Sequence, residues 1–240
     1  MALERKGYKV CQPVPADSDR IWQFMEEHFN EDEPILRSLK TNENNTWVDR
    51  FVRKEIRQNL IEPCLVEPTS IILEDSDGDI AGIKLGHPIS IHNLPAPGYW
   101  SFNWIRNFPW LVPTKLYQYS YFSEFQSSEE YCNLKPASLL KSLNLENVFM
   151  GQMLGVSRGH RRKGLACDMI QRSMELAAKL GCQGYVVESS GIYSQMSYKK
   201  HQFQVMKEIF YEDFKDGQGN IVFNDTMEHK SVKMLFKPLS

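Results

Sequence analysis

The sequence lacks any apolar run long enough to cross a bilayer, and it lacks internal repeats and low-complexity segments. Its most apolar window, residues 104–112, is far too short for a transmembrane helix and contains Arg106 and Pro109. The N-terminal residues 1–11 are polar and have no apolar core of the kind found in signal peptides. We therefore expect a cytoplasmic protein that does not associate with membranes.

The chain also lacks an excess of charge and a patterned set of cysteines. It has 28 Lys and Arg residues against 30 Asp and Glu residues, a net charge of −2, which gives no reason to expect nucleic acid as a partner. The five cysteines are scattered singly, and no Cys-x-x-Cys pair or Cys/His spacing indicates zinc. This usage predicts a reducing compartment, no disulfide framework and no metal.

What is present is an ordinary globular composition, with 42% hydrophobic and 24% charged residues over 240 positions. One domain spanning residues 1–240 is therefore expected. Alternating and β-rich runs predict strands at residues 8–14, 70–74, 80–85, 147–156, 184–188, 203–214 and 230–238. Helical spacing predicts helices at residues 21–29, 47–60, 165–180 and 193–201.

Turn residues refine these boundaries. Asp17 or Ser18 is expected to cap the first helix and Pro34 to stop it, which makes the acidic run 31–33 a helix exit. The cluster at 75–78 predicts a hairpin turn. Residues 88–145 have prolines, many aromatics and little periodicity, and we interpret them as a packed insertion with a helix near 117–127.

A basic, glycine-containing loop lies between the strand at 147–156 and the helix at 165–180. The first turn of a helix exposes unpaired N–H groups and the positive end of its dipole, which favour an anion. Gly164 and Ala166 leave room for a pyrophosphate to approach the backbone, and the basic residues add positive charge. A solvated basic loop is the plainer alternative. The loop has no Gly-Lys-Ser/Thr and no Gly-x-Gly-x-x-Gly, which excludes a Walker A loop and disfavours a Rossmann start.

The run Arg161-Arg162-Lys163-Gly164-Leu165-Ala166 resembles the pyrophosphate signature of the GNAT acetyltransferase superfamily, Arg/Gln-x-x-Gly-x-Gly/Ala. Residues 154–156 are similar to the fourth strand of that family, which pairs with the pantetheine arm. Residues 198–203 resemble its Tyr-x-x-x-Gly-Phe element, with Gln202 in place of the glycine, which we expect to alter a turn only. The likeness covers residues 147–214, the expected acetyl-CoA-binding core.

The resemblance implies a single α+β domain. Its central sheet would be mixed, mostly antiparallel and twisted, flanked by helices, with a V-shaped splay between the fourth and fifth strands. It implies acetyl-CoA as co-substrate and no metal. The expected cofactor-binding residues are Met153, Leu154, Gly155, Val156, Arg161, Arg162, Lys163, Gly164, Leu165 and Ala166.

A second likeness narrows the expectation. Residues 29–35 resemble the Asp-Glu-Pro-Leu segment of insect-type arylalkylamine (dopamine-type) N-acetyltransferases, in which the glutamate before the proline is the proposed general base. In this sequence that residue is Glu33. Residues 189–194 resemble the serine-rich turn of the same family, with Ser189 competing for the aligned role of Ser190. The resemblance implies four candidate catalytic residues: Glu33, Ser190, Ser194 and Tyr198.

The chemistry gives these residues roles. A primary amine with a pKa of about 10 arrives protonated, and a carboxylate can remove the proton if its own pKa is raised. Glu31 and Asp32 would raise the pKa of Glu33 by like-charge repulsion. Backbone N–H groups at 152–154 could stabilise an oxyanion, and Tyr198 or Ser194 could protonate the leaving thiolate. Each residue could instead be structural: a solvated acidic run, a packing aromatic or a turn serine.

Several alternatives remain open at this stage. The acceptor could be a polyamine, an amino acid or a protein lysine rather than an arylalkylamine. An acyl-cysteine route through Cys167 or Cys182 is possible, although both lie on or beside an apolar-faced helix where cysteine usually fills the core. The chain could also be a non-catalytic acyl-CoA-binding protein. Its expected partners are acetyl-CoA and a small amine, and it would be a monomer or weak dimer.

Overall fold

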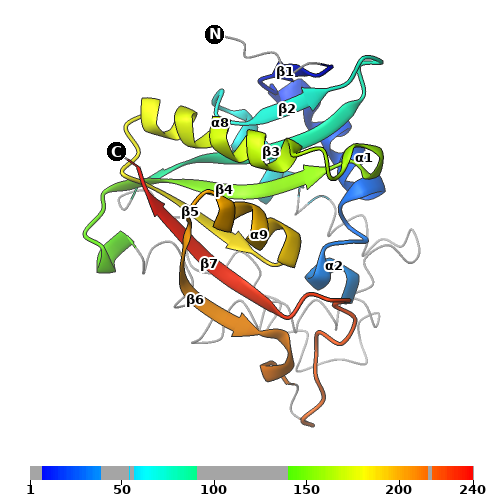
Figure 1. Cartoon of the computed structure of the whole chain (residues 1–240), viewed down its shortest axis with the longest axis vertical. Helices are drawn as coiled ribbons and strands as arrows, with labels where there is room; N and C mark the ends of the chain where they lie inside the picture. Colours follow the sequence, from blue (N-terminus) through cyan, green and yellow to red (C-terminus); the bar gives the residue numbers. More distant parts are fainter. Residues whose placement is uncertain (1–6, 39–53, 55–56, 91–139, 216–217, 240) are drawn as a thin grey trace.

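The computed structural model describes residues 7–38, 54, 57–90, 140–215 and 218–239. Over these ranges the chain forms one α+β domain around a seven-stranded mixed sheet with the order β1-β2-β3-β4-β5-β7-β6 (Figure 1). The strands are β1 (Lys9–Cys11), β2 (Ile71–Glu74), β3 (Ile80–Ser90), β4 (Asn147–Val156), β5 (Gly184–Ser189), β6 (Gln204–Phe210) and β7 (Ser231–Pro238). The longer helices are α1 (Ser18–His28), α2 (Pro34–Ser38), α8 (Leu165–Lys179) and α9 (Ile192–Lys200).

All neighbouring strands are antiparallel except β4 and β5, which run parallel. This parallel pair is short: it joins only residues 149–151 of β4 to residues 185–187 of β5. β4 continues to Val156 without β5 beside it, and the two strands diverge visibly in Figure 1. The expected V-shaped splay is therefore present, with its apex at Gly151 and Val187.

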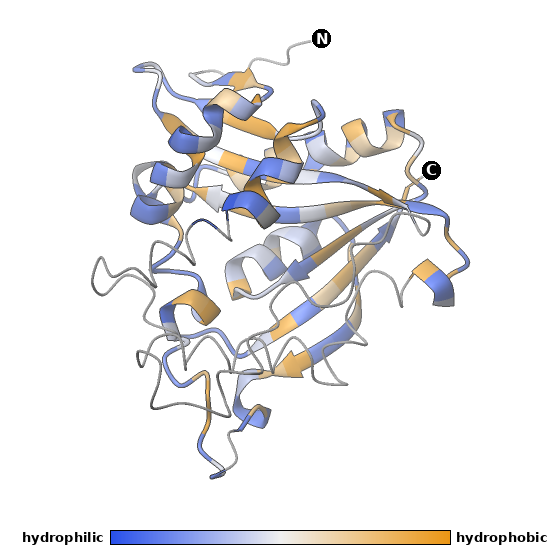
Figure 2. Cartoon of the chain, turned by 180° about the vertical axis from the view of Figure 1, so that it is seen from behind, coloured by the Kyte–Doolittle hydropathy of each residue, from blue (hydrophilic) through white to orange (hydrophobic). Residues whose placement is uncertain are grey.

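Successive side chains along each strand point to opposite faces of the sheet and pack into a hydrophobic core on each face. On one face, Ile72 and Ile83 pack with Ile21 and Met25 of α1. On the other face, α8 and α9 cover the sheet, and their apolar residues meet side chains such as Tyr185. Figure 2 shows the apolar residues following the strands through the middle of the molecule. Burial on both faces explains the nearly continuous apolar runs of β2 and β4.

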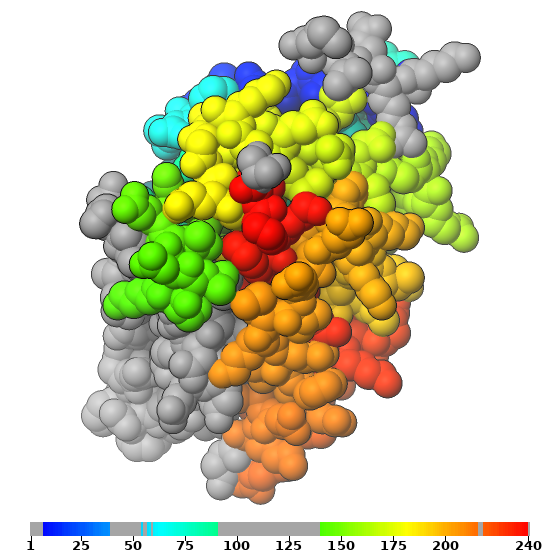
Figure 3. Space-filling model, turned by 60° about the vertical axis from the view of Figure 1, so that its left-hand side comes forward, coloured from blue at the N-terminus to red at the C-terminus, as the bar shows by residue number. Residues whose placement is uncertain are grey.

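The strand β6 forms one edge of the sheet. It pairs with β7 only, and its side chains are largely exposed or half-buried. In Figure 3 the red β7 is visible between α8 and the orange β6. Gln202, which we expected to alter the turn at the end of α9, instead adopts the positive φ, 63°, that glycine adopts readily. Both Gln202 and Phe203 donate backbone hydrogen bonds into the last turn of α9.

The hairpin at 75–78, the strand at 147–156 and helices α8 and α9 agree with the sequence predictions. Four boundaries were wrong. The first strand, expected at residues 8–14, ends at Cys11. The first helix ends at His28, and Pro34 begins α2 rather than stopping α1, because proline is well suited to the first turn of a helix. β3 continues through Ser90 into the range assigned to the insertion. β6 ends at Phe210, where a short 3₁₀ turn, Tyr211–Asp213, follows.

Two predictions fall mainly outside the described residues. Of the expected helix at 47–60, the structure describes Lys54 and the π-helical segment that starts at Arg57. The expected helix at 117–127 and most of the aromatic insertion lie outside the described ranges.

Candidate active site

The basic loop after β4 has the backbone of an anion-binding site. It begins with a 3₁₀ turn, Arg158–His160, and ends at Gly164, the N-cap of α8, whose φ is 79°. Arg162 also has a positive φ, 59°, which is uncommon for a residue with a side chain. The chain thus turns sharply before α8, whose N-terminus exposes unpaired N–H groups that favour an anion. Residues 161–164 are exposed and accessible to a ligand.

The arginines of this loop contact the acidic turn between α1 and α2. Arg158 pairs with Glu31 at 2.5 Å, and Arg161 pairs with Asp32 at 2.6 Å. Arg161 also donates to the carbonyl oxygen of His28 at 3.0 Å. The acidic run is therefore a turn that holds the basic loop, rather than a solvated helix exit. Because these side chains are substantially exposed, each ion pair adds little stability by itself.

Glu33 lies at the end of that turn, and its carboxylate faces inward. Its Oε2 accepts a hydrogen bond from the backbone N–H of Leu36 at 2.6 Å, and the hydroxyl of Ser190 donates a second. Burial raises the pKa of Glu33 above its ordinary value, and this outweighs the hydrogen bonds, which lower the pKa. The direction agrees with the sequence prediction, but the cause is burial, since Glu31 and Asp32 are paired with arginines.

Ser190 connects Glu33 to the region after β5. Its carbonyl oxygen accepts a hydrogen bond from the Tyr211 hydroxyl at 2.8 Å. Tyr211 is buried, and both its burial and the nearby Glu33 carboxylate raise the pKa of its phenol, which therefore stays protonated. The structure thus brings together two of the sequence candidates, Glu33 and Ser190, and adds Tyr211, which the sequence prediction assigned only to a strand.

Ser194 lies on the first turn of α9 and bonds to its own segment. Its Oγ is 2.5 Å from that of Ser189 and donates to the carbonyl of Gly191 at 2.8 Å. The N-terminus of α9 is further held by His229, whose Nδ1 accepts the N–H of Ile192 at 3.1 Å. Ser189, the competitor of Ser190, is fully buried on β5 and faces Ser194 rather than Glu33.

Tyr198 points from α9 into the core. It packs edge-to-face on Phe203, with ring centroids 4.9 Å apart. Its hydroxyl is buried, and within the described ranges of the chain it has no hydrogen-bond partner. Burial raises the pKa of this phenol. The hydroxyl is therefore protonated, and it belongs to the side-chain cluster that includes Tyr185.

The four β4 residues expected to line the pantetheine arm alternate between the two faces. Met153 and Gly155 are buried toward α1, whereas Leu154 and Val156 are half-buried on the α8 side. A Cβ on Gly155 would lie 3.0 Å from the ring of Phe24, so glycine here allows α1 to approach β4 closely. Beyond Gly151 this stretch has no β5 partner, which leaves its backbone edge open to another chain of hydrogen-bonding groups.

An aromatic group lies next to Glu33 and was missed by the sequence prediction. Tyr211 and Phe214 both contact Phe223, with ring centroids 5.7 Å and 5.6 Å apart. The segment carrying Phe223 is tied to α2 by the ion pair between Arg37 and Asp225, with Nε and Oδ1 2.9 Å apart. These three residues are close in sequence, and the antiparallel bridge between Lys215 and Ile221 brings Phe214 and Phe223 together. The approach of Tyr211 to Glu33, by contrast, depends on the tertiary fold.

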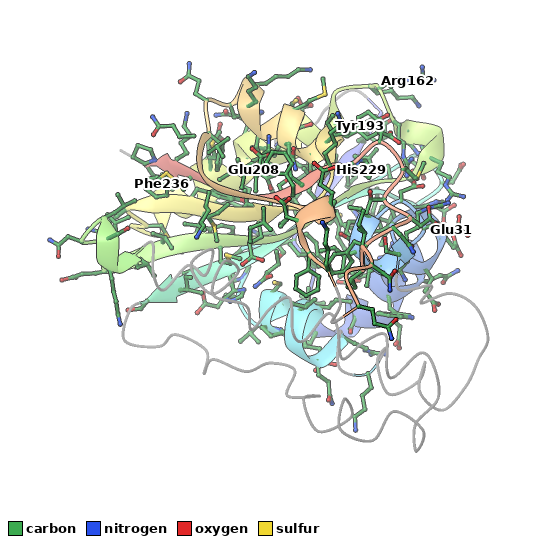
Figure 4. The ribbon with its side chains drawn as sticks, turned by 90° about the horizontal axis from the view of Figure 1, so that it is seen from below. Glu31, Arg162, Tyr193, Glu208, His229 and Phe236 are labelled. Carbon is green, nitrogen blue, oxygen red and sulfur yellow. The ribbon has the colours of Figure 1, made fainter. Side chains whose placement is uncertain are left out.

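Figure 4 shows Glu31, Arg162, Tyr193 and His229 in one half of the molecule and Phe236 in the other. The exposed Tyr193 ring lies edge-on to His229, with centroids 5.9 Å apart. Among the residues that the structure describes, no three His, Cys, Asp or Glu side chains are placed to hold a metal ion. None of the described helices has the length and apolar character needed to cross a membrane.

Comparison with known proteins gives the fold. No family model matches the sequence. Arylalkylamine N-acetyltransferase 2 of Aedes aegypti superposes with a TM-score of 0.74 at 21% identity, covering 97% of this chain and 99% of that one. The polyamine N-acetyltransferase of Drosophila melanogaster superposes with a TM-score of 0.68 at 16% identity, covering 97% and 100%. Mosquito arylalkylamine N-acetyltransferase like 5b superposes with a TM-score of 0.66 at 17% identity, covering 97% of this chain and 100% of that one.

The chain has the GNAT fold. The resemblance read from the basic loop is therefore confirmed at the level of the fold, over nearly the whole chain. In the GNAT fold of this protein, the splay and the basic loop follow one another along the chain, between β4 and α8. At identities of this order the comparison leaves the acceptor open.

Proposed function

We propose that this protein is an acetyl-CoA-dependent N-acetyltransferase whose preferred acceptors are primary arylalkylamines. The amine would attack the acetyl group of acetyl-CoA directly, while both substrates are bound in a ternary complex. The observation that carries the proposal is the half-buried Glu33, whose carboxylate accepts hydrogen bonds from Ser190 and from the backbone N–H of Leu36. A carboxylate with a raised pKa is a suitable base for an ammonium group, which must lose a proton before it can attack.

The remaining groups fit the co-substrate. When bound, acetyl-CoA supplies an activated thioester. Backbone N–H groups of residues 162–166 and the side chains of Arg162 and Lys163 would hold its pyrophosphate, while the open edge of β4 at 153–156 would hold the pantetheine amides. Arg161 belongs to the same loop but donates a hydrogen bond to Asp32, so we assign it both to the pyrophosphate and to Asp32. Backbone donors at 152–154 would face the thioester carbonyl.

The proton path follows from the hydrogen bonds. Glu33 accepts the proton of the incoming ammonium, and Ser190 orients the carboxylate by donating to it. The departing sulfur requires a proton at the other side of the splay, and the protonated, unpaired hydroxyl of Tyr198 is one donor. Ser194 is the second candidate for that role. Cysteine takes no part in this scheme: Cys182 is buried, and burial raises the pKa of its thiol, which disfavours the nucleophilic thiolate.

The aromatic group supports an aryl acceptor. Tyr211 lies near the Glu33 carboxylate and packs on Phe223, which packs on Phe214, so aromatic residues border the proposed base. Several carboxylates around the amine site would instead favour a polyamine acceptor.

An acceptor panel tests the proposal. Purified protein is mixed with acetyl-CoA and tyramine, dopamine, serotonin, putrescine, agmatine or a histone peptide, and free CoA thiol is followed. We expect kcat/KM for the aryl amines to exceed that for putrescine and agmatine at least about tenfold, the order that one lost ring contact gives. Preference for putrescine would remove the arylalkylamine assignment. Acetyl-CoA-dependent thermal stabilisation without any product would make the protein an acyl-CoA sensor.

A further inference from the structure

Among the described residues, the core contains a buried lysine that the proposed mechanism does not use. Lys84 of β3 is 1% exposed, on the side of the sheet covered by α8. Within the part of the chain that the structure describes, no ion pair includes it. A lysine in such a place loses hydration without gaining a carboxylate, so it costs stability unless its N–H groups are satisfied.

Two backbone carbonyl groups satisfy them. The Nζ of Lys84 donates to the carbonyl oxygen of Leu85 at 3.0 Å and to that of Met153 at 3.3 Å. It also lies 5.6 Å from the centre of the Tyr185 ring, which the Ser173 hydroxyl fixes through a bond of 2.7 Å. The side chain therefore joins β3 to β4 by a route outside the normal ladder of the sheet.

These contacts are made at an irregularity in that ladder. Leu85 pairs with Met153, but the next residue of β3, Gly86, pairs with Gly151, so Gln152 is an extra residue on β4. A bulge of this kind leaves its extra residue unpaired and bends the strand. Gly151 is also the last β4 residue that pairs with β5, so the bulge lies where the two strands diverge in Figure 1.

Gly151 makes room for the lysine. A Cβ at this position would lie 2.8 Å from the Nζ of Lys84 and 2.9 Å from the Tyr185 ring. The terminal amine thus rests directly against the backbone of the splay apex. Lys84, Gly151 and the bulge at Gln152 form one assembly, and the absence of a side chain at 151 is what permits it.

Filling this space with a lysine is energetically unfavourable. Burial lowers the pKa of Lys84 to about 7, a direct expression of the desolvation cost. A methionine of similar length would fill the same volume without that cost. A methionine has no donor, so it could not reproduce the carbonyl contacts at the bulge, and it has no charge to place near the Tyr185 ring.

We propose that Lys84 is a positioning residue for acyl transfer: it fixes the β4 bulge so that the backbone donors at 152–154 face the thioester carbonyl. This inference rests on the proposed function. Lys84 touches neither substrate in this scheme; it acts through the carbonyl of Met153 and the strand that carries it. Loss of its N–H donors should loosen the bulge and lower the rate of transfer while leaving the pyrophosphate loop unchanged.

The test compares Lys84→Met, Lys84→Gln and wild type in steady-state kinetics, in calorimetric titrations with CoA, and in thermal unfolding. For Lys84→Met we expect kcat to fall about tenfold to a hundredfold, the range of one lost oxyanion donor or less. The Kd of CoA should change less than threefold and the unfolding temperature should stay the same or rise. Lys84→Gln keeps two N–H donors on a shorter side chain and should recover part of kcat.

A core variant on the same face serves as control. Met169→Ala removes a buried side chain that packs over Gly82 but makes no hydrogen bond to β4. It should lower the unfolding temperature and leave kcat near wild type. A Lys84→Met enzyme with wild-type kcat overturns the inference, as does one whose kcat loss simply follows lost stability or is not restored at all by glutamine. Absence of any amine acetylation by the wild type would instead refute the proposed function.

Discussion

At the scale of single residues, the environment decides which groups can act. Three acidic residues follow one another at 31–33, but only Glu33 turns inward, while its neighbours pair with Arg158 and Arg161. Burial therefore singles out one carboxylate and raises its pKa. The same effect keeps the hydroxyls of Tyr198 and Tyr211 protonated.

The pH dependence of the reaction tests Glu33. The base must be deprotonated, and its pKa is raised, so kcat/KM should increase with pH through a limb above the ordinary value of 4.5. Glu33→Gln should lower kcat about a hundredfold and remove this limb, within the range expected for loss of a general base. The measurement is a pH–rate profile with two amines of different pKa.

The two amines separate base from substrate. A limb caused by the amine moves when the amine is exchanged, whereas the Glu33 limb stays in place. Glu27→Gln, a change of the same kind at an exposed position of α1, serves as control and should behave as wild type. A pH profile that is the same in Glu33→Gln and wild type would exclude Glu33 as the base.

At the scale of elements, turns and caps hold the site in place. α8 begins at Gly164 in a left-handed conformation, and the acidic turn sets α2 against the basic loop. The end of α9 has the same requirement for a left-handed residue, but there it is met by Gln202 at a φ of 63°. A residue with a Cβ is strained in the left-handed backbone conformation, whereas glycine is not.

The end of α9 offers a stability test. Gln202 is exposed, so replacing it removes little packing. Gln202→Gly should stabilise the fold by about 1 kcal/mol, because relief of left-handed strain outweighs the greater chain entropy of unfolded glycine. Chemical denaturation measures the change. Gln202→Ala, which keeps a Cβ in the same conformation, should give no gain; an equal gain in both variants would show that the turn is unstrained.

At the scale of the whole molecule, distant segments form a single site. The acidic turn comes from residues 31–33, the loop from 157–164, Ser190 follows β5, and Phe223 precedes β7. The ion pairs Arg158–Glu31 and Arg37–Asp225 connect the first fifth of the chain to its last half. A ligand bound across the loop and the splay should consequently stabilise the whole domain.

Thermal unfolding with CoA measures that linkage. A ligand that binds only the folded state at a hundred times its Kd stabilises by about 2.7 kcal/mol, which raises the midpoint by roughly 5 to 10 °C for a chain of this size. Gly164→Val should abolish the shift, because a β-branched residue cannot adopt the φ of 79° at the helix N-cap. Gly219→Val, at a similar φ in a distant turn, controls for general strain. An unchanged CoA shift in Gly164→Val would exclude the loop as the phosphate site.

The sequence by itself predicted the hairpin at 75–78 and the basic loop before α8, because turns and helix starts depend on neighbouring residues. The resemblance of that loop to the GNAT signature also predicted the fold. Pro34 was misread because a proline that ends one helix and a proline that begins the next look alike locally. Burial, however, is a property of the folded chain. Only the tertiary structure could distinguish Glu33 from Asp32, pair Ser190 with it, bring Tyr211 near it, and place Lys84 against Gly151 at the splay, since each of these contacts joins segments that only folding brings together.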